Sequence, residues 1–400
     1  MTVRTLKSGA EMHVVSALVI SVAAACSSTK PRLNPPRPDS TYSAQIAHGV
    51  THQYRWYAAG PWAVHTLTLD TRRCVVGFRS IKAQNRVVGR ETTSSMFKRA
   101  ALVAAYPVLA AINADFFSFE PPGISEGPQI SGGALLKSEG SHREAIEDRG
   151  LRLQPVFAFT RNGKSVITHT RLHGEVRVGS TTLPLAGVNV RTRADSAFVF
   201  TPFFGDTTVT ESSTIELIAR DGVIVGIDSS AAGVQIPATG FVVALRAGRA
   251  QLNTIRVGQN IRWQASFDGL DNVAEMVGGY PMLLLDSKPV HHDEAGLRAT
   301  FSDRRHPRAA IARDKGGRVY IVAVDGRRPG YSDGMTLQEL GDYLLAHGMV
   351  DALNLDGGGS TTLVVRGEIV NRPTDASGER PVANALLVVE GWPDSCSRKR

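Results

Sequence analysis

Two apolar segments that each end in an aspartate flank one amphipathic helix near the C-terminus, and this order constrains the fold more than any other feature. Residues 318–326, RVYIVAVDG, are predicted to form a strand that ends at Asp325. Residues 336–348, TLQELGDYLLAHG, carry a leucine stripe, a threonine and glutamate in capping-box spacing, and a closing glycine. Residues 349–359, MVDALNLDGGG, form a second strand that ends at Asp356. Strand, helix and strand in this order predict a right-handed crossover that joins parallel strands.

The crossover brings the two aspartates to one edge of a sheet. The carboxyl ends of parallel strands meet at the same edge, and ligands of such sheets tend to bind there. Asp325 and Asp356 would lie ~5 Å apart on neighbouring strands, or ~10 Å apart with one strand between them. Two carboxylates at either separation can share one substrate.

The composition favours strands over helices in the rest of the chain. Among the 400 residues, glycine is frequent (39), aromatic residues are sparse (6%) and β-branched residues recur in short runs. We therefore predict an α+β fold, a strand-rich mixed sheet with few helices and one βαβ crossover near the C-terminus. The net charge of +8 comes from dispersed basic residues without a basic stripe or interleaved aromatics, which argues against nucleic acid binding.

The N-terminus has the pattern of an export signal. Residues 14–26, VVSALVISVAAAC, are apolar but too few for a comfortable membrane span, and two basic residues precede them. The ending AAAC resembles a bacterial lipoprotein signal, in which a lipidated Cys26 would anchor the exported protein to an envelope membrane. The alternative is an ordinary cleaved signal with an incidental cysteine, which would leave the protein secreted.

Composition shifts along the chain predict its organisation. It divides into a signal peptide (1–26), a flexible tether rich in proline and serine (27–45), a folded domain (46–392) and a basic tail (393–400). Cys74 and Cys396 lie far apart in sequence, and we expect two unpaired thiols there.

The segment NLDGGGSTT, residues 354–362, is the strongest candidate for a functional site. Asn354 and Asp356 point to one face of their strand, and such a polar pair is unfavourable unless something polar meets it. The loop behind them offers an anion converging backbone N–H groups and hydroxyl donors. These groups belong to Gly357, Gly358, Gly359, Ser360 and Thr361. A glycine hairpin with a capping aspartate is the structural alternative.

Other segments carry weaker candidates. In RRHPR, His306 and Arg308 open an apolar strand, where arginine can bind phosphate and histidine can donate to it or shuttle a proton. In AINADFF, Asn113 and Asp115 end a strand and could hold sugar hydroxyls, orient a catalytic group, ligate a divalent cation or cap neighbouring backbone. The weakest are Gly279 in VGGYP, which could serve only close backbone passage, and Asn384 in RPVANALLVV, which could be satisfied internally.

These segments occur in the order seen in the phosphodiester glycosidase family, which the chain resembles from about residue 100 to 390. The segments are AINADFF, VGGYPMLL, RHPRAAIARDKGGRVYIVAVDGR, TLQELGDYLLAHGMVDALNLDGGGSTTLVV and RPVANALLVV. The resemblance implies that residues 46–392 form a phosphodiester glycosidase domain. Such a hydrolase cleaves the sugar C1–O bond of N-acetylglucosamine-1-phosphodiester-like groups and releases free sugar and a phosphomonoester. The substrate would be a glycan phosphodiester of the envelope or of exopolysaccharide, or a nucleotide-sugar-like molecule.

The resemblance also implies roles for individual residues. We expect Asp356 to act as carboxylate base or nucleophile, Asp325 as its partner, and His306 at the phosphate. The substrate-binding residues would be Arg308, Gly357, Gly358, Gly359, Ser360, Thr361, Asn113, Asp115, Asn354, Gly279 and Asn384. This chemistry requires no cofactor; a bound Ca²⁺ is compatible with the Asn and Asp side chains, but no loop has the spacing that predicts one.

Two further functions are compatible with the same residues. A phosphoesterase would cut P–O rather than C–O at this site, but that chemistry usually calls for clustered metal ligands at short spacing, which the sequence lacks. A non-catalytic, lipid-tethered glycan-binding protein could keep the fold, although the retained acids and bases argue against it.

Overall fold

The computed structural model describes residues 36–73, 75–119, 123–139, 154–190, 197–209, 214–230, 233–246, 254–290 and 297–391. Cys26, Cys74 and Cys396 lie outside the described residues, as do the expected signal peptide and basic tail. Within these ranges, no helix has the length and apolar character needed to cross a membrane.

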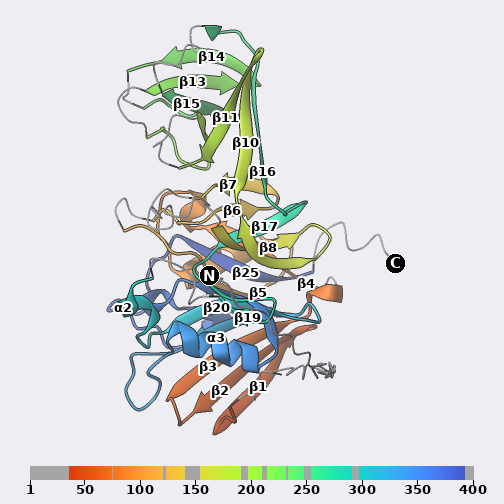
Figure 1. Cartoon of the computed structure of the whole chain (residues 1–400), viewed down its shortest axis with the longest axis vertical. Helices are drawn as coiled ribbons and strands as arrows, with labels where there is room; N and C mark the ends of the chain where they lie inside the picture. Colours follow the sequence, from red (N-terminus) through yellow and green to blue (C-terminus); the bar gives the residue numbers. More distant parts are fainter. Residues whose placement is uncertain are drawn as a thin grey trace, which may run out of the picture. The chain divides into compact units, whose positions relative to one another are not determined.

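Strands dominate the described chain and form four sheets, which confirms the predicted strand-rich α+β fold (Figure 1). The first sheet has the order β1 (Ser40–Ala47), β2 (Val50–Tyr57), β3 (Trp62–Leu69), β21 (Val319–Val324), β20 (Arg308–Asp314), β22 (Met349–Leu355), β18 (Met282–Leu285) and β19 (Lys288–Pro289). The second has the order β24 (Glu368–Ile369), β23 (Leu363–Val365), β5 (Val108–Asn113), β25 (Asn384–Glu390) and β4 (Val76–Lys82).

Two more sheets come from the middle of the chain. The third has the order β7 (Ala134–Lys137), β6 (Gln129–Ser131), β17 (Val273–Gly278), β8 (Gln154–Thr160) and β9 (Ser165–Thr170). The fourth has the order β14 (Val223–Asp228), β13 (Thr214–Arg220), β15 (Gly240–Arg246), β12 (Ala197–Phe200), β11 (Thr181–Val188), β10 (Leu172–Val178) and β16 (Ile261–Phe267). The helices of the described ranges are α1 (Thr93–Val103), α2 (Ala299–Ser302) and α3 (Leu337–Ala346).

The predicted crossover is present: β21 leads through α3 to β22, and the two strands run parallel. Both pair antiparallel with β20, which lies between them, so the wider of the two expected separations applies. Neighbouring strands of the first sheet are antiparallel throughout, and the parallel neighbours of the described chain are β11 and β12 in the fourth sheet. We expected a mixed sheet around the crossover, but no two neighbouring strands that the structure describes in this first sheet are parallel.

The first sheet is covered on both faces, which holds its strand ends in place. Helix α3 lies against this sheet (Figure 1), and its Leu340 and Leu344 belong to the same buried cluster as Val322. Ile311, Leu353 and other residues of the opposite face pack against the second sheet in a fully buried core. Thr336 caps α3 with a capping box: its hydroxyl accepts the Glu339 N–H, and the Glu339 carboxylate accepts the Thr336 N–H.

The boundary of the expected tether needs correction. β1 begins at Ser40 and pairs with β2, so residues 40–45 lie in the first sheet and not in a tether. Most side chains of β1 are exposed because it is the edge strand, and it therefore lacks the apolar alternation by which a strand is detected in sequence.

Candidate active site

The candidate site lies at the edge of the first sheet where β21 and β22 end and β20 begins. Asp325 follows β21 and Asp356 follows β22, while His306 and Pro307 precede β20. The Gly358 N–H donates to the Pro307 carbonyl at 2.8 Å, so the loop after β22 folds back onto the start of β20. The structure therefore brings the glycine loop and the histidine segment together.

The first two glycines of the loop are required by this close approach. A Cβ atom at Gly357 would lie 2.8 Å from the carbonyl oxygen of Pro307, which is closer than side chains tolerate. Gly358 has φ +62°, in the left-handed region that glycine adopts without strain.

The loop also admits two guanidinium groups that the sequence analysis did not select. A Cβ atom at Gly359 would lie 2.5 Å from Nη2 of Arg380, and one at Gly358 would lie 3.1 Å from Nη2 of Arg327. The third glycine is thus explained by Arg380. The guanidinium groups of Arg327 and Arg380 therefore lie next to the Gly358–Gly359 backbone, whose N–H groups we expected to bind an anion.

The converging N–H groups themselves are largely engaged elsewhere. Those of Ser360 and Thr361 donate to the carbonyls of Gly357 and Gly358 as the loop closes into a short 3₁₀ turn, and that of Gly358 donates to Pro307. The expected anion-binding nest at Gly357–Gly359 is therefore corrected: guanidinium groups, and not these N–H groups, offer positive charge at the loop.

Asp356 is a half-buried carboxylate with an unusual pKa. Burial raises its pKa to about 7, and the nearby charge of Asp115 adds to this rise. Hydrogen bonds from the Ser360 hydroxyl and the Gly357 N–H, together with the charge of Arg380, act in the opposite direction. Asp356 can therefore exchange a proton near neutral pH, as a general base or acid must.

Arg327 and Arg380 form a crowded pair of cations beside Asp356. Arg380 donates from Nε to Asp375 at 2.6 Å and from Nη1 to the Ser360 hydroxyl at 3.4 Å. The side chain of Arg327 is exposed, and its backbone is held in the left-handed region at φ +55°. Burial and then the charge of Arg380 lower the pKa of Arg327. A bound anion would relieve this repulsion, and phosphate matches guanidinium geometry best.

His306 lies beside Arg327 in a defined tautomer. Its Nε2 faces the Thr300 carbonyl at 2.9 Å and must carry the proton, which leaves Nδ1 to accept from Arg327 Nη2 at 3.2 Å. Burial lowers the pKa of His306, and the charges of nearby arginines lower it further. A neutral His306 thus orients Arg327, and in this arrangement neither ring nitrogen is available to shuttle a proton.

Arg308 does not face the site, which corrects its expected phosphate contact. Only 1% of its surface is exposed, and its guanidinium donates to backbone carbonyls at 2.6–3.1 Å. Those carbonyls belong to Met335, Phe301 and Arg304. Burial lowers the pKa of Arg308 to about 10, and the charge of Arg327 contributes. Arg308 therefore holds together the segments that carry His306.

Asp325 likewise engages its carboxylate in hydrogen bonds within the protein. It is fully buried, and its carboxylate accepts from the Tyr331 hydroxyl at 3.0 Å and the Arg372 N–H at 2.7 Å. Nε2 of His65 lies 3.8 Å away. Burial raises the pKa of Asp325. Asp325 lies at the predicted edge of the sheet. Its hydrogen bonds hold the loop that carries Arg327. The carboxylate whose charge raises the pKa of Asp356 is that of Asp115.

Asn113 joins the second sheet to the loop: it donates to the Asp356 carbonyl at 2.6 Å and accepts from the Thr362 N–H at 3.0 Å. The side-chain oxygen of Asn384 accepts from the Asp115 N–H at 2.9 Å, and its amide donates to Gln129 at 3.0 Å. Both residues are buried, so backbone capping fits Asn113, and internal satisfaction fits Asn384, better than a sugar contact.

Asp115, Asn354 and Gly279 meet around a close backbone passage. Asp115 accepts from the Gly127 N–H at 2.5 Å, and Asn354 donates to the Tyr280 carbonyl at 2.7 Å. A Cβ atom at Gly279 would lie 2.5 Å from the Asn354 carbonyl oxygen, so this glycine is required for packing. These contacts are with protein backbone.

Three buried side-chain oxygens near the loop lack a hydrogen-bond partner among the described residues, those of Asn354, Thr361 and Thr362. Within the described ranges, no group of three His, Cys, Asp or Glu side chains is arranged to hold a metal ion.

Comparison with known proteins identifies relatives of this region. Residues 205–389 match the family model described as phosphodiester glycosidase. The prophage-derived uncharacterized protein YomE of Bacillus subtilis is 34% identical over 120 residues, which cover 30% of this chain and 17% of that protein. N-acetylglucosamine-1-phosphodiester alpha-N-acetylglucosaminidase of Bos taurus is 38% identical over 82 residues, 20% of this chain and 15% of the enzyme. A hypothetical protein from Synechocystis has a similar structure, with a TM-score of 0.73 at 21% identity over 88% of this chain and 64% of that one.

These similarities differ in what they establish. The chain spans less than a fifth of the length of the two sequence relatives, and the structural similarity at 21% identity shows the fold alone. The family model, in contrast, includes β20–β22, the Asp356 loop and Arg380. The similarity to the phosphodiester glycosidase family is therefore a similarity of residues 205–389, the part of the chain that carries the candidate site.

Proposed function

We propose that this protein hydrolyses the C1–O bond of glycosyl-1-phosphodiesters. The observation that carries the proposal is a carboxylate, Asp356, with a pKa near neutrality, whose loop is approached by two crowded guanidinium groups, those of Arg327 and Arg380. Asp356 can act at the sugar carbon C1, and the two guanidinium groups can bind the phosphate. The match of residues 205–389 to the phosphodiester glycosidase model supports the reaction class, and the name of the bovine relative suggests N-acetylglucosamine as the sugar.

The reaction would divide its charges between these two sides. As the C1–O bond breaks, its electron pair moves to the phosphate oxygen, and positive charge develops at C1 in an oxocarbenium-like transition state. Arg327 and Arg380 would bind the phosphate oxygens and stabilise the departing phosphomonoester. Ionised Asp356 would stabilise C1 or take a proton from the water whose oxygen adds there. A phosphate leaving group is already a stable anion, so it needs little protonation.

The remaining residues of the site would act through these groups. Ser360 would hold the Asp356 carboxylate by its hydrogen bond, and His306 would position Arg327. Asp325 would position the same arginine from the other side by fixing its loop.

The cellular setting rests on the N-terminal pattern. We propose that residues 1–26 direct export and that Cys26 carries a lipid anchor, which would place the enzyme beside envelope or extracellular polysaccharide phosphodiesters.

Hydrolysis in ¹⁸O-labelled water tests the bond that is cut. We expect the purified protein to release free N-acetylglucosamine from UDP-N-acetylglucosamine or a synthetic N-acetylglucosamine-1-phosphodiester, with label at C1. Label in the phosphate would instead identify a phosphoesterase, and no turnover would favour a glycan-binding protein. Parallel reactions with EDTA and with added Ca²⁺ test whether the site uses a cation.

Replacing Arg327 with glutamine should weaken phosphate binding. The loss of a guanidinium contact with the leaving group should lower kcat/KM by about 10- to 100-fold. Arg328→Gln is the matched control, because Arg328 is the adjacent exposed arginine and donates to the Pro373 carbonyl. Equal kcat/KM values for the two variants would exclude Arg327 from the phosphate site.

The pH profile should report the ionisation of Asp356. Since the pKa of its carboxyl is raised to about 7 and the ionised form is required, kcat/KM should rise with pH through about 7. Ser360→Ala removes a hydrogen bond that favours the ionised form, so its profile should move to higher pH. Ser180→Ala, in an exposed turn, should leave the profile unchanged. A wild-type profile that falls through this range would assign Asp356 the role of acid instead.

A further inference from the structure

A cavity of about 940 Å³ lies apart from the Asp356 loop, between α1 and strands β4, β25 and β17. None of the residues assigned to the candidate active site lines it. Its volume falls near the upper end of the range for small-molecule sites in proteins. Phe78 and Ala274 line it from the sheets, and Val103 and Ala104 from the end of α1.

The helix that borders the cavity exposes apolar side chains at its C-terminal end. Leu102 is 86% exposed and Val103 83%, and Tyr106, which follows the helix and lines the cavity, is 38% exposed. Isolated exposed apolar residues are common, but a group of them beside an apolar cavity marks a surface that meets an apolar ligand or a membrane.

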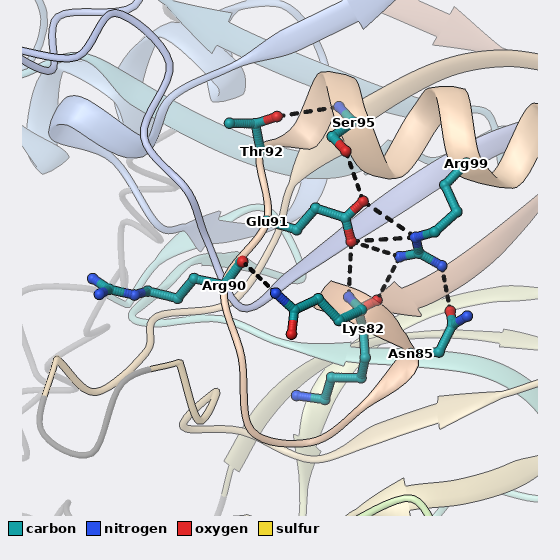
Figure 2. A network of polar contacts seen from close by, with 8 residues as sticks. Lys82, Asn85, Arg90, Glu91, Thr92, Ser95 and Arg99 are labelled. Carbon is teal, nitrogen blue, oxygen red and sulfur yellow. Dashed lines mark hydrogen bonds and ion pairs between the residues drawn. The ribbon is translucent and has the colours of Figure 1, made fainter.

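Three guanidinium groups and one carboxyl also line the cavity. Arg99 is held in place by Glu91 at 2.9 Å, by Asn85 and by the Lys82 carbonyl, as Figure 2 shows. This network fixes a cation at one end of the apolar wall. Arg99 already forms an ion pair with Glu91, so its charge is partly neutralised for a ligand in the cavity.

Arg79 and Arg161 lie toward the third sheet. Arg79 donates to Glu275 at 3.3 Å, and this buried carboxyl also accepts the N–H groups of Ser80 and Gly132. Burial raises the pKa of Glu275 to about 7, so at neutral pH it offsets only part of the arginine charge. The cavity thus combines an apolar wall with three guanidinium groups and one carboxyl.

We infer that this cavity binds a single-chain anionic amphiphile, with its alkyl chain against α1 and Phe78 and its carboxylate or phosphate head at Arg79 and Arg161. Burial of an alkyl chain supplies the affinity, and the arginines select an anionic head over a neutral one. The amphiphile comes either from solution or from an anionic membrane, and the head-group chemistry is the same in both cases.

Titration with the fluorescent probe dansylamino-undecanoic acid tests the inference on the full chain. We expect saturable binding, with the acid at least about tenfold tighter than its methyl ester. Ala104→Trp should fill the mouth of the cavity and weaken binding at least about tenfold, because the extended backbone of Ala104 accepts a large side chain. Ala101→Trp, on the exposed surface of the same helix and outside the cavity lining, is the matched control.

The charge and the source of the ligand have their own tests. Arg161→Gln should weaken binding of the acid severalfold, whereas Lys98→Gln, on the exposed face of α1, should not. The membrane source predicts that Ala101→Trp co-sediments with phosphatidylglycerol vesicles but not with phosphatidylcholine vesicles. It also predicts that Ala104→Trp co-sediments with neither. Binding of the free acid without that difference would identify a soluble one.

The inference is overturned if acid and ester bind equally, if Ala104→Trp binds as the wild type does, or if no saturable binding occurs. Hydrolysis of glycosyl phosphodiesters should be the same in Ala104→Trp and the wild type, since the cavity is separate from the active site.

Discussion

The approach of the Gly357–Gly359 backbone to Pro307 is the contact on which the candidate active site depends. The hydrogen bond from Gly358 to the Pro307 carbonyl joins the end of β22 to the start of β20. A side chain at Gly357 would push these segments apart, and one at Gly359 would displace Arg380. The same closed loop positions Asp356, whose carboxyl accepts hydrogen bonds from the Ser360 hydroxyl and the Gly357 N–H.

Under the proposed function, an anionic substrate would balance the charges at the site. Arg327 and Arg380 repel each other, while burial and the charge of Asp115 raise the pKa of Asp356 to about 7. A phosphodiester would neutralise the arginines and leave the carboxylate facing the sugar. Burial lowers the pKa of Arg327 and raises the pKa of Asp356, so in both groups it disfavours the charged form.

The crossover could be predicted from sequence because an amphipathic, capped helix between two apolar strands leaves few alternatives. The insertion of β20 between β21 and β22 could not, because strand order depends on long-range packing that periodicity does not record. The placement of Asp356 and the glycine loop at this edge followed from the crossover alone.

The direction of individual side chains was beyond the reach of the sequence. Arg308 and Arg327 both belong to short basic clusters, yet Arg308 turns inward to backbone carbonyls while Arg327 meets the glycine loop. The cluster GRRPG directly after Asp325 was a signal for Arg327, and Arg380 opens the segment RPVANALLVV. Neither could be chosen over other arginines without knowing that their segments converge on Gly358 and Gly359.

Turnover by Asp356→Asn tests the central role of this carboxylate most directly. The amide keeps the size of the side chain but cannot take a proton or balance charge at C1, so kcat/KM should fall at least about 100-fold. The free energy of unfolding in urea should be maintained, because a neutral group replaces a carboxyl whose charge is disfavoured by burial. Asp221→Asn, at an exposed turn residue, should retain full activity. An Asp356→Asn variant as active as Asp221→Asn would contradict the account.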